Sequence, residues 1–275
     1  MNYIEVSISF DPKKVDGEIL LAEVAQIPFE SFIENEGELL GYILKNEFSE
    51  AELKLIPIIN ENQLEVTCKE IQQINWNEEW EKNFDPIEIS QECVVRADFH
   101  EKSKNYKYDI RINPKMSFGT GHHATTSLML AQMLDLDFKN SLALDMGTGT
   151  GVLAILATMM GANNVLAIDN DEWAYRNSVE NVALNHCTDN IDVKEGDVSL
   201  IGGRKFNFVL ANINKNVIKA QLSDYVDSME QNALILLSGI LKEDCDEIIE
   251  LGESLGLTKL EQKQKDKWSL LVFSN

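Results

Sequence analysis

The chain has 275 residues, enough for one large domain or two smaller ones, and 44% are hydrophobic, enough for a substantial core. Its net charge of −22 argues against nucleic-acid binding, because no basic run offsets that field, and it either attracts a basic partner or only maintains solubility. No apolar run approaches the roughly 20 residues of a membrane span, and the first residues do not resemble a signal peptide. Four cysteines without C-x-x-C spacing indicate reduced thiols and a cytoplasmic protein.

Residues 1–72 are predicted to form a small α+β domain. Strands are expected at 3–10, 29–34, 39–44 and 64–68, and helices at 15–25 and 49–59. Ser49 and Glu52 match a capping box at the start of the second helix. The order βαββαβ is that of a ferredoxin-like unit, which by itself indicates no function.

Residues 73–90 are predicted to connect two domains. Trp76, Trp80 and Phe84 are spaced i, i+4, i+8, which places them on one face of a helix. This face is expected to pack the two domains together, and the alternative is a surface for a partner.

Residues 91–275 are predicted to form a doubly wound α/β domain, because apolar strands alternate with helices after residue 142. Strands are expected at 93–99, 108–112, 142–145, 165–168, 191–194, 206–211, 233–237, 258–262 and 268–273. Helices are expected at 127–134, 152–160, 172–185, 217–229 and 242–255.

A glycine-rich turn follows the strand that ends at Asp145. Gly147, Gly149 and Gly151 stand at alternate positions and precede an apolar helix, which is typical of a nucleotide-type binding turn. The spacing G-x-G-x-G differs from the dinucleotide pattern G-x-G-x-x-G, and the Lys of a P-loop is absent. Asp169 ends the next strand, where a carboxylate is placed to accept both hydroxyls of a ribose.

The glycine motif with its two acids resembles that of class I S-adenosylmethionine-dependent methyltransferases. The last strand of their sheet is antiparallel, and the two strands expected at 258–262 and 268–273 are typical of such an ending. Further segments occur in a fixed order around this motif: the chain contains Phe118-Gly119-Thr120-Gly121, Thr125-Thr126, the glycine motif, Asp169, Ala211-Asn212-Ile213 and Leu237-Ser238-Gly239-Ile240-Leu241. With these segments, the chain from about Trp76 onward, and more loosely before it, resembles the ribosomal protein L11 methyltransferase (PrmA) family. The family usually has Cys and Ser between the glycines, where this chain has Thr148 and Thr150.

The resemblance implies a mostly parallel seven-stranded, Rossmann-like sheet and S-adenosyl-L-methionine as the cofactor. It implies that Thr126, Gly147, Asp169 and Asn212 contact that cofactor. The implied reaction transfers methyl groups to lysine side chains and the N-terminal amine of a basic ribosomal protein, L11, which the N-terminal domain would hold.

The residues themselves support parts of this interpretation. Gly147 and Gly149 would let the backbone approach the methionine part of the cofactor, and Asn212 offers an amide oxygen that could orient an incoming N–H. Asp197 is placed either to reach the adenine amino group or to remain a solvated turn carboxylate. No dedicated general base is evident. His122 and His123 are adjacent and lack a third ligand at zinc spacing, so no metal is expected.

Two alternatives stay open. The same cofactor could serve methyl transfer to a small molecule or to RNA, although the acidic charge argues against RNA and the additional domain argues against a small substrate. A non-catalytic S-adenosylmethionine-binding interaction protein is the other alternative, and the intact glycine motif argues against it.

Overall fold

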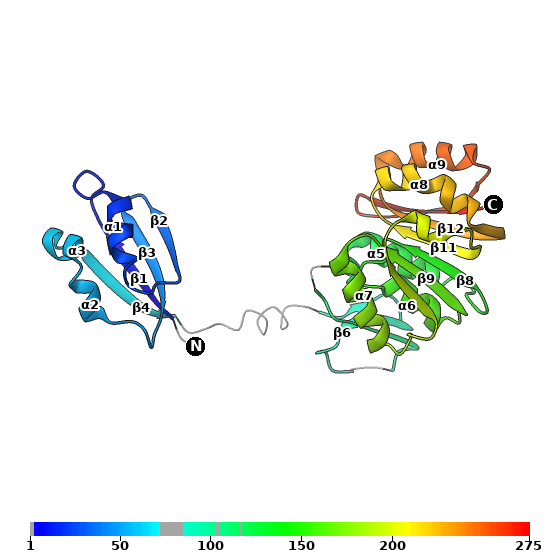
Figure 1. The fold of residues 1–275 in the computed structure, drawn as a ribbon. Coiled ribbons are helices and arrows are strands. Elements are labelled where there is room, and N and C mark those ends of the chain that lie inside the picture. Colours follow the sequence, from blue (N-terminus) through cyan, green and yellow to red (C-terminus); the bar gives the residue numbers. More distant parts are fainter. Residues whose placement is uncertain (1–2, 72–84, 103–104, 116) are drawn as a thin grey trace. The chain divides into compact units, whose positions relative to one another are not determined.

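The structure is a computed structural model that describes residues 3–71, 85–102, 105–115 and 117–275. The chain divides into two compact units, Met1–Asn83 and Phe84–Asn275, which run from blue to cyan and from cyan-green to red in Figure 1. The predicted aromatic face of Trp76, Trp80 and Phe84 lies outside the described residues. Among those that are described, every helix is too short or too polar to span a membrane.

The first unit is an antiparallel sheet with helices on one face. Its elements are β1 (Tyr3–Ser9), α1 (Gly17–Val24), β2 (Ser31–Asn35), β3 (Glu38–Leu44), α2 (Glu50–Lys54), α3 (Pro57–Asn62) and β4 (Glu65–Ile71). The strand order β2-β3-β1-β4, with every neighbouring pair antiparallel, is that of a ferredoxin-like sheet. Alternate strand residues such as Val6 and Ile43 are fully buried against Leu20 and Leu53 of the helices, so only one face of the sheet carries the core.

The single helix predicted at 49–59 is wrong, because the structure has two short helices there. Ser49 caps α2 as predicted, and its hydroxyl accepts a hydrogen bond from Glu52 N at 3.3 Å. Pro57 stops that helix because the residue before a proline avoids the α conformation. Ile56 is accordingly extended, with φ −61° and ψ 125°, and Pro57 begins α3.

The second unit contains two sheets. The small sheet has the order β5-β6-β7 and consists of β5 (Ile87–Glu88), β6 (Cys93–Ala97) and β7 (Tyr108–Ile112). The large sheet consists of β8 (Leu142–Met146), β9 (Asn164–Asp169), β10 (Ile191–Glu195), β11 (Phe206–Asn212), β12 (Met229–Leu241), β13 (Thr258–Lys265) and β14 (Trp268–Ser274). Its order is β10-β9-β8-β11-β12-β14-β13, and β14 is antiparallel to both its neighbours while the other pairs are parallel. The predicted class I methyltransferase fold is confirmed.

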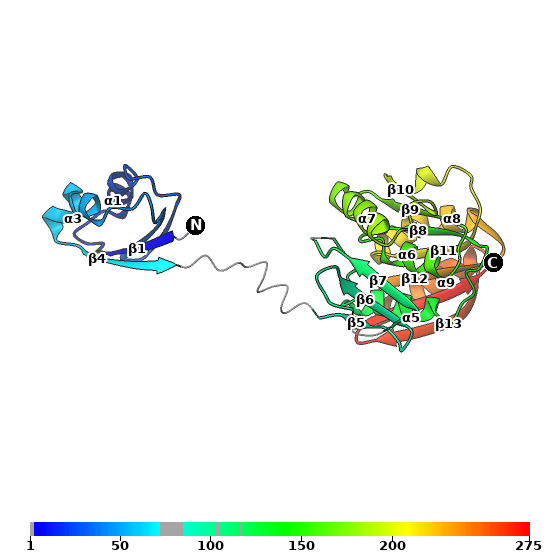
Figure 2. The same cartoon turned by 90° about the horizontal axis from the view of Figure 1, so that it is seen from below.

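Helices cover both faces of the large sheet (Figure 2). They are α5 (Ala124–Met133), α6 (Val152–Met159), α7 (Glu172–Leu184), α8 (Lys215–Asp227) and α9 (Cys245–Ser254), with 3-10 turns at Val198–Ile201 and Lys242–Asp244. One core contains residues of α5, α6, α7 and the small sheet, and the other contains residues of α8 and α9. Because both faces are buried, the strands read as continuous apolar runs that end at polar residues.

Candidate active site

A cavity of about 600 Å³ opens at the carboxyl ends of the parallel strands. It is lined by residues at or just after the ends of β8, β9, β10 and β11 and by a residue within β12, namely Met146, Asp169, Gly196, Asn212 and Gly239. β8 and β11 are neighbours, and the strand order reverses between them. Open α/β sheets bind ligands at such a switch point, so the fold places the cavity where a ligand site is expected.

The glycine loop, residues 147–151, is packed against two other segments of the protein. A Cβ added to Gly149 would lie 2.2 Å from the carbonyl oxygen of Phe118, and one added to Gly147 would lie 2.2 Å from Cγ2 of Ile213. Both glycines also have positive φ, +57° and +68°. Glycine is therefore needed at both positions so that the loop can pack closely against these two segments, in addition to the predicted approach of a ligand.

Asp145 lies beneath this loop and does not line the cavity. Its carboxylate Oδ2 accepts hydrogen bonds from Thr148 Oγ1 at 2.7 Å and from Ala154 N at 3.2 Å. Oδ1 is buried and has no partner among the described residues. Burial, with a smaller contribution from the charge of Asp169, raises the pKa of Asp145 to about 7. The acid of the motif thus fixes the shape of the loop from inside.

Asp169 lies on the cavity wall, where the sequence predicted it. Its Oδ2 accepts a hydrogen bond from Gly149 N at 2.8 Å, and its Oδ1 accepts one from Asp171 N at 3.0 Å. Each oxygen keeps acceptor capacity for a ligand hydroxyl. Asp197 also lines the cavity, but its Oδ1 accepts from Ser199 N and Oγ at 2.9 and 2.6 Å, and these bonds lower its pKa.

Asn212 presents an unpaired acceptor at the cavity. Its Nδ2 donates to Thr126 Oγ1 at 3.3 Å, and this contact orients the amide. Its Oδ1 is buried without a partner among the described residues. Thr126 itself is fully buried behind Asn212 and is not on the cavity wall, whereas its neighbour Thr125 is. In the structure Thr126 contacts Asn212, and the cofactor contact predicted for Thr126 stays a prediction.

The Phe-Gly loop, residues 117–121, closes one side of the cavity. Thr150 of the glycine loop donates from its backbone N to Phe118 O at 2.9 Å and from its Oγ1 to Gly119 O at 2.7 Å. The two loops thus form a single wall. His123 stacks edge-on with Phe118 and with Trp268, each pair of ring centroids lying 5.0 Å apart, which gives the rim an aromatic character.

The sequence pattern did not single out Trp268, because this residue was predicted only as the first residue of the last strand. It also missed Asn181 of α7, whose Nδ2 donates to Thr150 O at 2.9 Å. A signal for Asn181 existed: Asn177, Asn181 and Asn185 recur every four residues on a helix face that should be apolar. In the described residues, no group of His, Cys, Asp and Glu side chains is arranged to hold a metal.

Comparison with known proteins identifies the family. The model of the family "Ribosomal protein L11 methyltransferase (PrmA)" matches residues 11–275. The ribosomal protein L11 methyltransferase of Phocaeicola vulgatus is 42% identical over 279 residues, which is 99% of each chain. That of Porphyromonas gingivalis is 44% identical, over 94% of this chain and 90% of its own. A solved ribosomal protein L11 methylase from Lactobacillus delbrueckii subsp. bulgaricus has the same fold, with a TM-score of 0.64 at 24% identity over 69% of this chain and 97% of its own. The chain therefore belongs to the ribosomal protein L11 methyltransferase (PrmA) family.

Proposed function

We propose that this protein transfers methyl groups from S-adenosyl-L-methionine to amino groups of ribosomal protein L11. The family supports a methyltransferase with this substrate. The observation that carries the chemical part is the amide oxygen of Asn212, which is buried at the cavity wall without a partner among the described residues. A buried acceptor left unpaired costs about 1–3 kcal/mol, so an N–H group from a ligand is its natural partner.

The cavity fits the cofactor. Its volume of about 600 Å³ suits a nucleoside-sized ligand. Asp169 would accept the ribose hydroxyls, and the backbone at Gly147 and Gly149 would face the methionine part. When bound, S-adenosylmethionine would supply a methyl carbon that an amine lone pair can attack, with the C–S bond breaking and the sulfur leaving as a neutral thioether.

The contribution of the protein is to position a neutral amine. Asn212 Oδ1 would accept one N–H and so direct the nitrogen lone pair, and positioning of this kind is the main source of rate in such displacements. A lysine amine costs about 4–5 kcal/mol to deprotonate at pH 7, and an α-amine costs about 1 kcal/mol. The aromatic rim of Phe118, His123 and Trp268 would exclude water from the amine, which favours its neutral form.

The test uses purified enzyme, labelled S-adenosylmethionine and a lysate from cells that lack the enzyme. Label is expected in one protein band that comigrates with purified L11, and hydrolysis of that band should release methylated lysine and methylated N-terminal residue. Asn212→Ala should lower kcat about ten- to hundredfold, because the lost hydrogen bond is of order 1–3 kcal/mol. Label in RNA or in a small molecule would contradict the proposed substrate.

We also propose that the N-terminal unit holds the protein substrate. The sheet face turned away from α1–α3 is open and combines apolar with acidic groups. Ile33 is 48% exposed there, Tyr42 donates from its hydroxyl to Glu5 at 3.0 Å, and Tyr3 donates to Glu30 at 2.7 Å. Aromatic and apolar groups among carboxylates suit a basic protein surface.

The corresponding test places a positive charge on this face in the full chain. Ile33→Lys should raise the KM for L11 several-fold while the affinity for S-adenosylmethionine stays unchanged. Leu55→Lys is the matched control, because Leu55 is 72% exposed but follows α2 on the helical side. Equal effects of the two variants, or none, would argue against recognition by the sheet face.

A further inference from the structure

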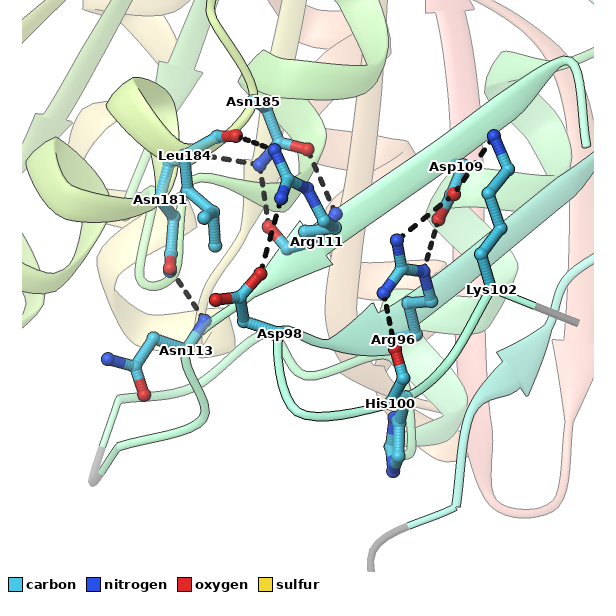
Figure 3. Close-up of polar contacts among 10 residues, drawn as sticks. All are labelled: Arg96, Asp98, His100, Lys102, Asp109, Arg111, Asn113, Asn181, Leu184 and Asn185. Atoms are coloured by element: carbon cyan, nitrogen blue, oxygen red, sulfur yellow. Dashed lines mark hydrogen bonds and ion pairs between the residues drawn. The ribbon is translucent and has the colours of Figure 1, made fainter.

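Two asparagines of α7, Asn177 and Asn181, and its C-cap residue Asn185 bind the backbone at the end of β7 and just after it (Figure 3, which labels Asn181 and Asn185). Asn185 accepts from Arg111 N at 2.9 Å and donates to Arg111 O at 2.6 Å. Asn181 Oδ1 accepts from Asn113 N at 2.7 Å, and Asn177 Nδ2 donates to Asn113 O at 3.0 Å. These side chains provide hydrogen-bond partners for backbone N–H and C=O groups that would otherwise be unpaired.

Asn181 differs from the other two because it also reaches the glycine loop. It is fully buried, and its Nδ2 donates to Thr150 O at 2.9 Å. Thr150 in turn holds Phe118 O and Gly119 O. The chain that leads into the Phe-Gly loop is therefore attached to Thr150 twice, through Asn181 at Asn113 and directly at Phe118 and Gly119.

This arrangement couples the two loops that form the cavity wall. Phe118 and Gly149 both line the cavity, and Gly149 N is the donor to Asp169. We propose that Asn181 is a positioning residue that holds the Phe-Gly loop and the glycine loop in the arrangement that binds S-adenosylmethionine. The inference rests on the proposed cofactor. If only a fraction of molecules keeps the competent arrangement, the apparent dissociation constant rises by the inverse of that fraction.

Other contacts in Figure 3 are not part of the hydrogen bonds that connect the two loops. Arg111 donates to Leu184 O and pairs with Asp98 at 3.3 Å. Arg96 pairs with Asp109 at 2.7 Å within the small sheet. These bonds tie β7 to the end of α7 and β6 to β7 without touching either loop, so they take no part in the coupling.

The experiment compares Asn181→Ala with Asn185→Ala in the full chain. Asn185→Ala loses side-chain bonds to Arg111 in β7, Asn181→Ala loses one to Asn113 just after β7, and both variants are expected to have a lower Tm. Calorimetry at a temperature where both are folded should show S-adenosylmethionine binding at least tenfold weaker in Asn181→Ala and within about twofold of the native value in Asn185→Ala. In the ligand-free protein, amide hydrogen exchange at Thr150 should accelerate only in Asn181→Ala.

Native affinity and native Thr150 exchange in Asn181→Ala would overturn the proposal, as would equal losses in the two variants. If Asn181→Ala does not fold, Thr150→Val provides the test. It removes the Oγ1 bond to Gly119 at nearly constant volume and should weaken binding several-fold, and unchanged binding would count against the coupling. If the native protein did not bind S-adenosylmethionine, the proposed function would fail, while the exchange measurement would still decide whether Asn181 couples the loops.

Discussion

The buried carboxyl of Asp145 is expected to make the stability of the protein depend on pH. Its pKa is about 7 in the folded protein, against an ordinary value of 3.8, because burial disfavours the charged form. The folded state therefore binds this proton more tightly than the unfolded state does. The resulting stabilisation is complete below about pH 3.8 and is lost as the pH rises through about 7.

The size of the effect follows from that difference in pKa. A difference of roughly three pH units corresponds to about 4 kcal/mol at 1.36 kcal/mol per unit. In Asp145→Asn, an amide oxygen still accepts from Thr148 and Ala154 but does not titrate. The free energy of unfolding of the native protein, minus that of the variant, should fall by about 4 kcal/mol between pH 4 and pH 8.

Urea unfolding of both proteins across this range measures the difference directly. Asp197→Asn is the control, since Ser199 lowers the pKa of Asp197 and its effect is confined to acid pH. That variant should follow the native curve between pH 5 and pH 8. Parallel curves for Asp145→Asn and the native protein would refute the reasoning, because they would mean that the folded carboxyl titrates normally.

Three further predictions concern the cofactor site and the partner. Asp169→Ala should weaken S-adenosylmethionine binding at least tenfold in calorimetry, since a charge-assisted hydrogen bond contributes about 1.5–3 kcal/mol, and unchanged affinity would remove Asp169 from the site. Gly149→Ala should abolish S-adenosylmethionine binding, because the added Cβ would clash with Phe118 O. Gly203→Ala is the control, because Gly203 also has a positive φ but an added Cβ would meet no other atom; it should lower the free energy of unfolding by only about 1–2 kcal/mol in denaturant unfolding. The kcat/KM for L11 should fall as salt rises from about 50 to 300 mM, because screening weakens steering of a basic protein by an acidic one, and a flat profile would assign the charge to solubility alone.

The fold was predictable where one short pattern decides the local structure. A strand buried on both faces reads as an apolar run, and the polar residue that ends it marks the edge of the sheet. Asp169 and Asn212 were placed at the cavity for this reason, and both line it. The helix predicted at 49–59 failed because the helix that Ser49 begins was extended through Pro57, which local chain geometry does not allow.

Side-chain contacts between distant segments were not predictable in the same way. Thr126 meets Asn212 across 86 positions, and Asn181 meets Thr150 across 31. Which way these side chains point depends on how α5 and α7 pack, and this is absent from the spacing of the motif. The sequence therefore predicted neither the contact of Thr126 with Asn212 nor that of Asn181 with Thr150.

The glycine motif can now be separated into ligand-facing and loop-forming parts. Thr148 Oγ1 donates to Asp145, and Thr150 Oγ1 donates to Gly119 O. Both side chains between the glycines therefore connect the glycine loop to other parts of the protein. What these positions require is a short side chain with a donor, and a serine or cysteine supplies one as a threonine does. Thr150→Ser should consequently keep the native affinity for S-adenosylmethionine in calorimetry, whereas Thr150→Val should lose part of it. Equal affinities of these two variants would show that the hydroxyl is dispensable and that only the backbone of the loop matters.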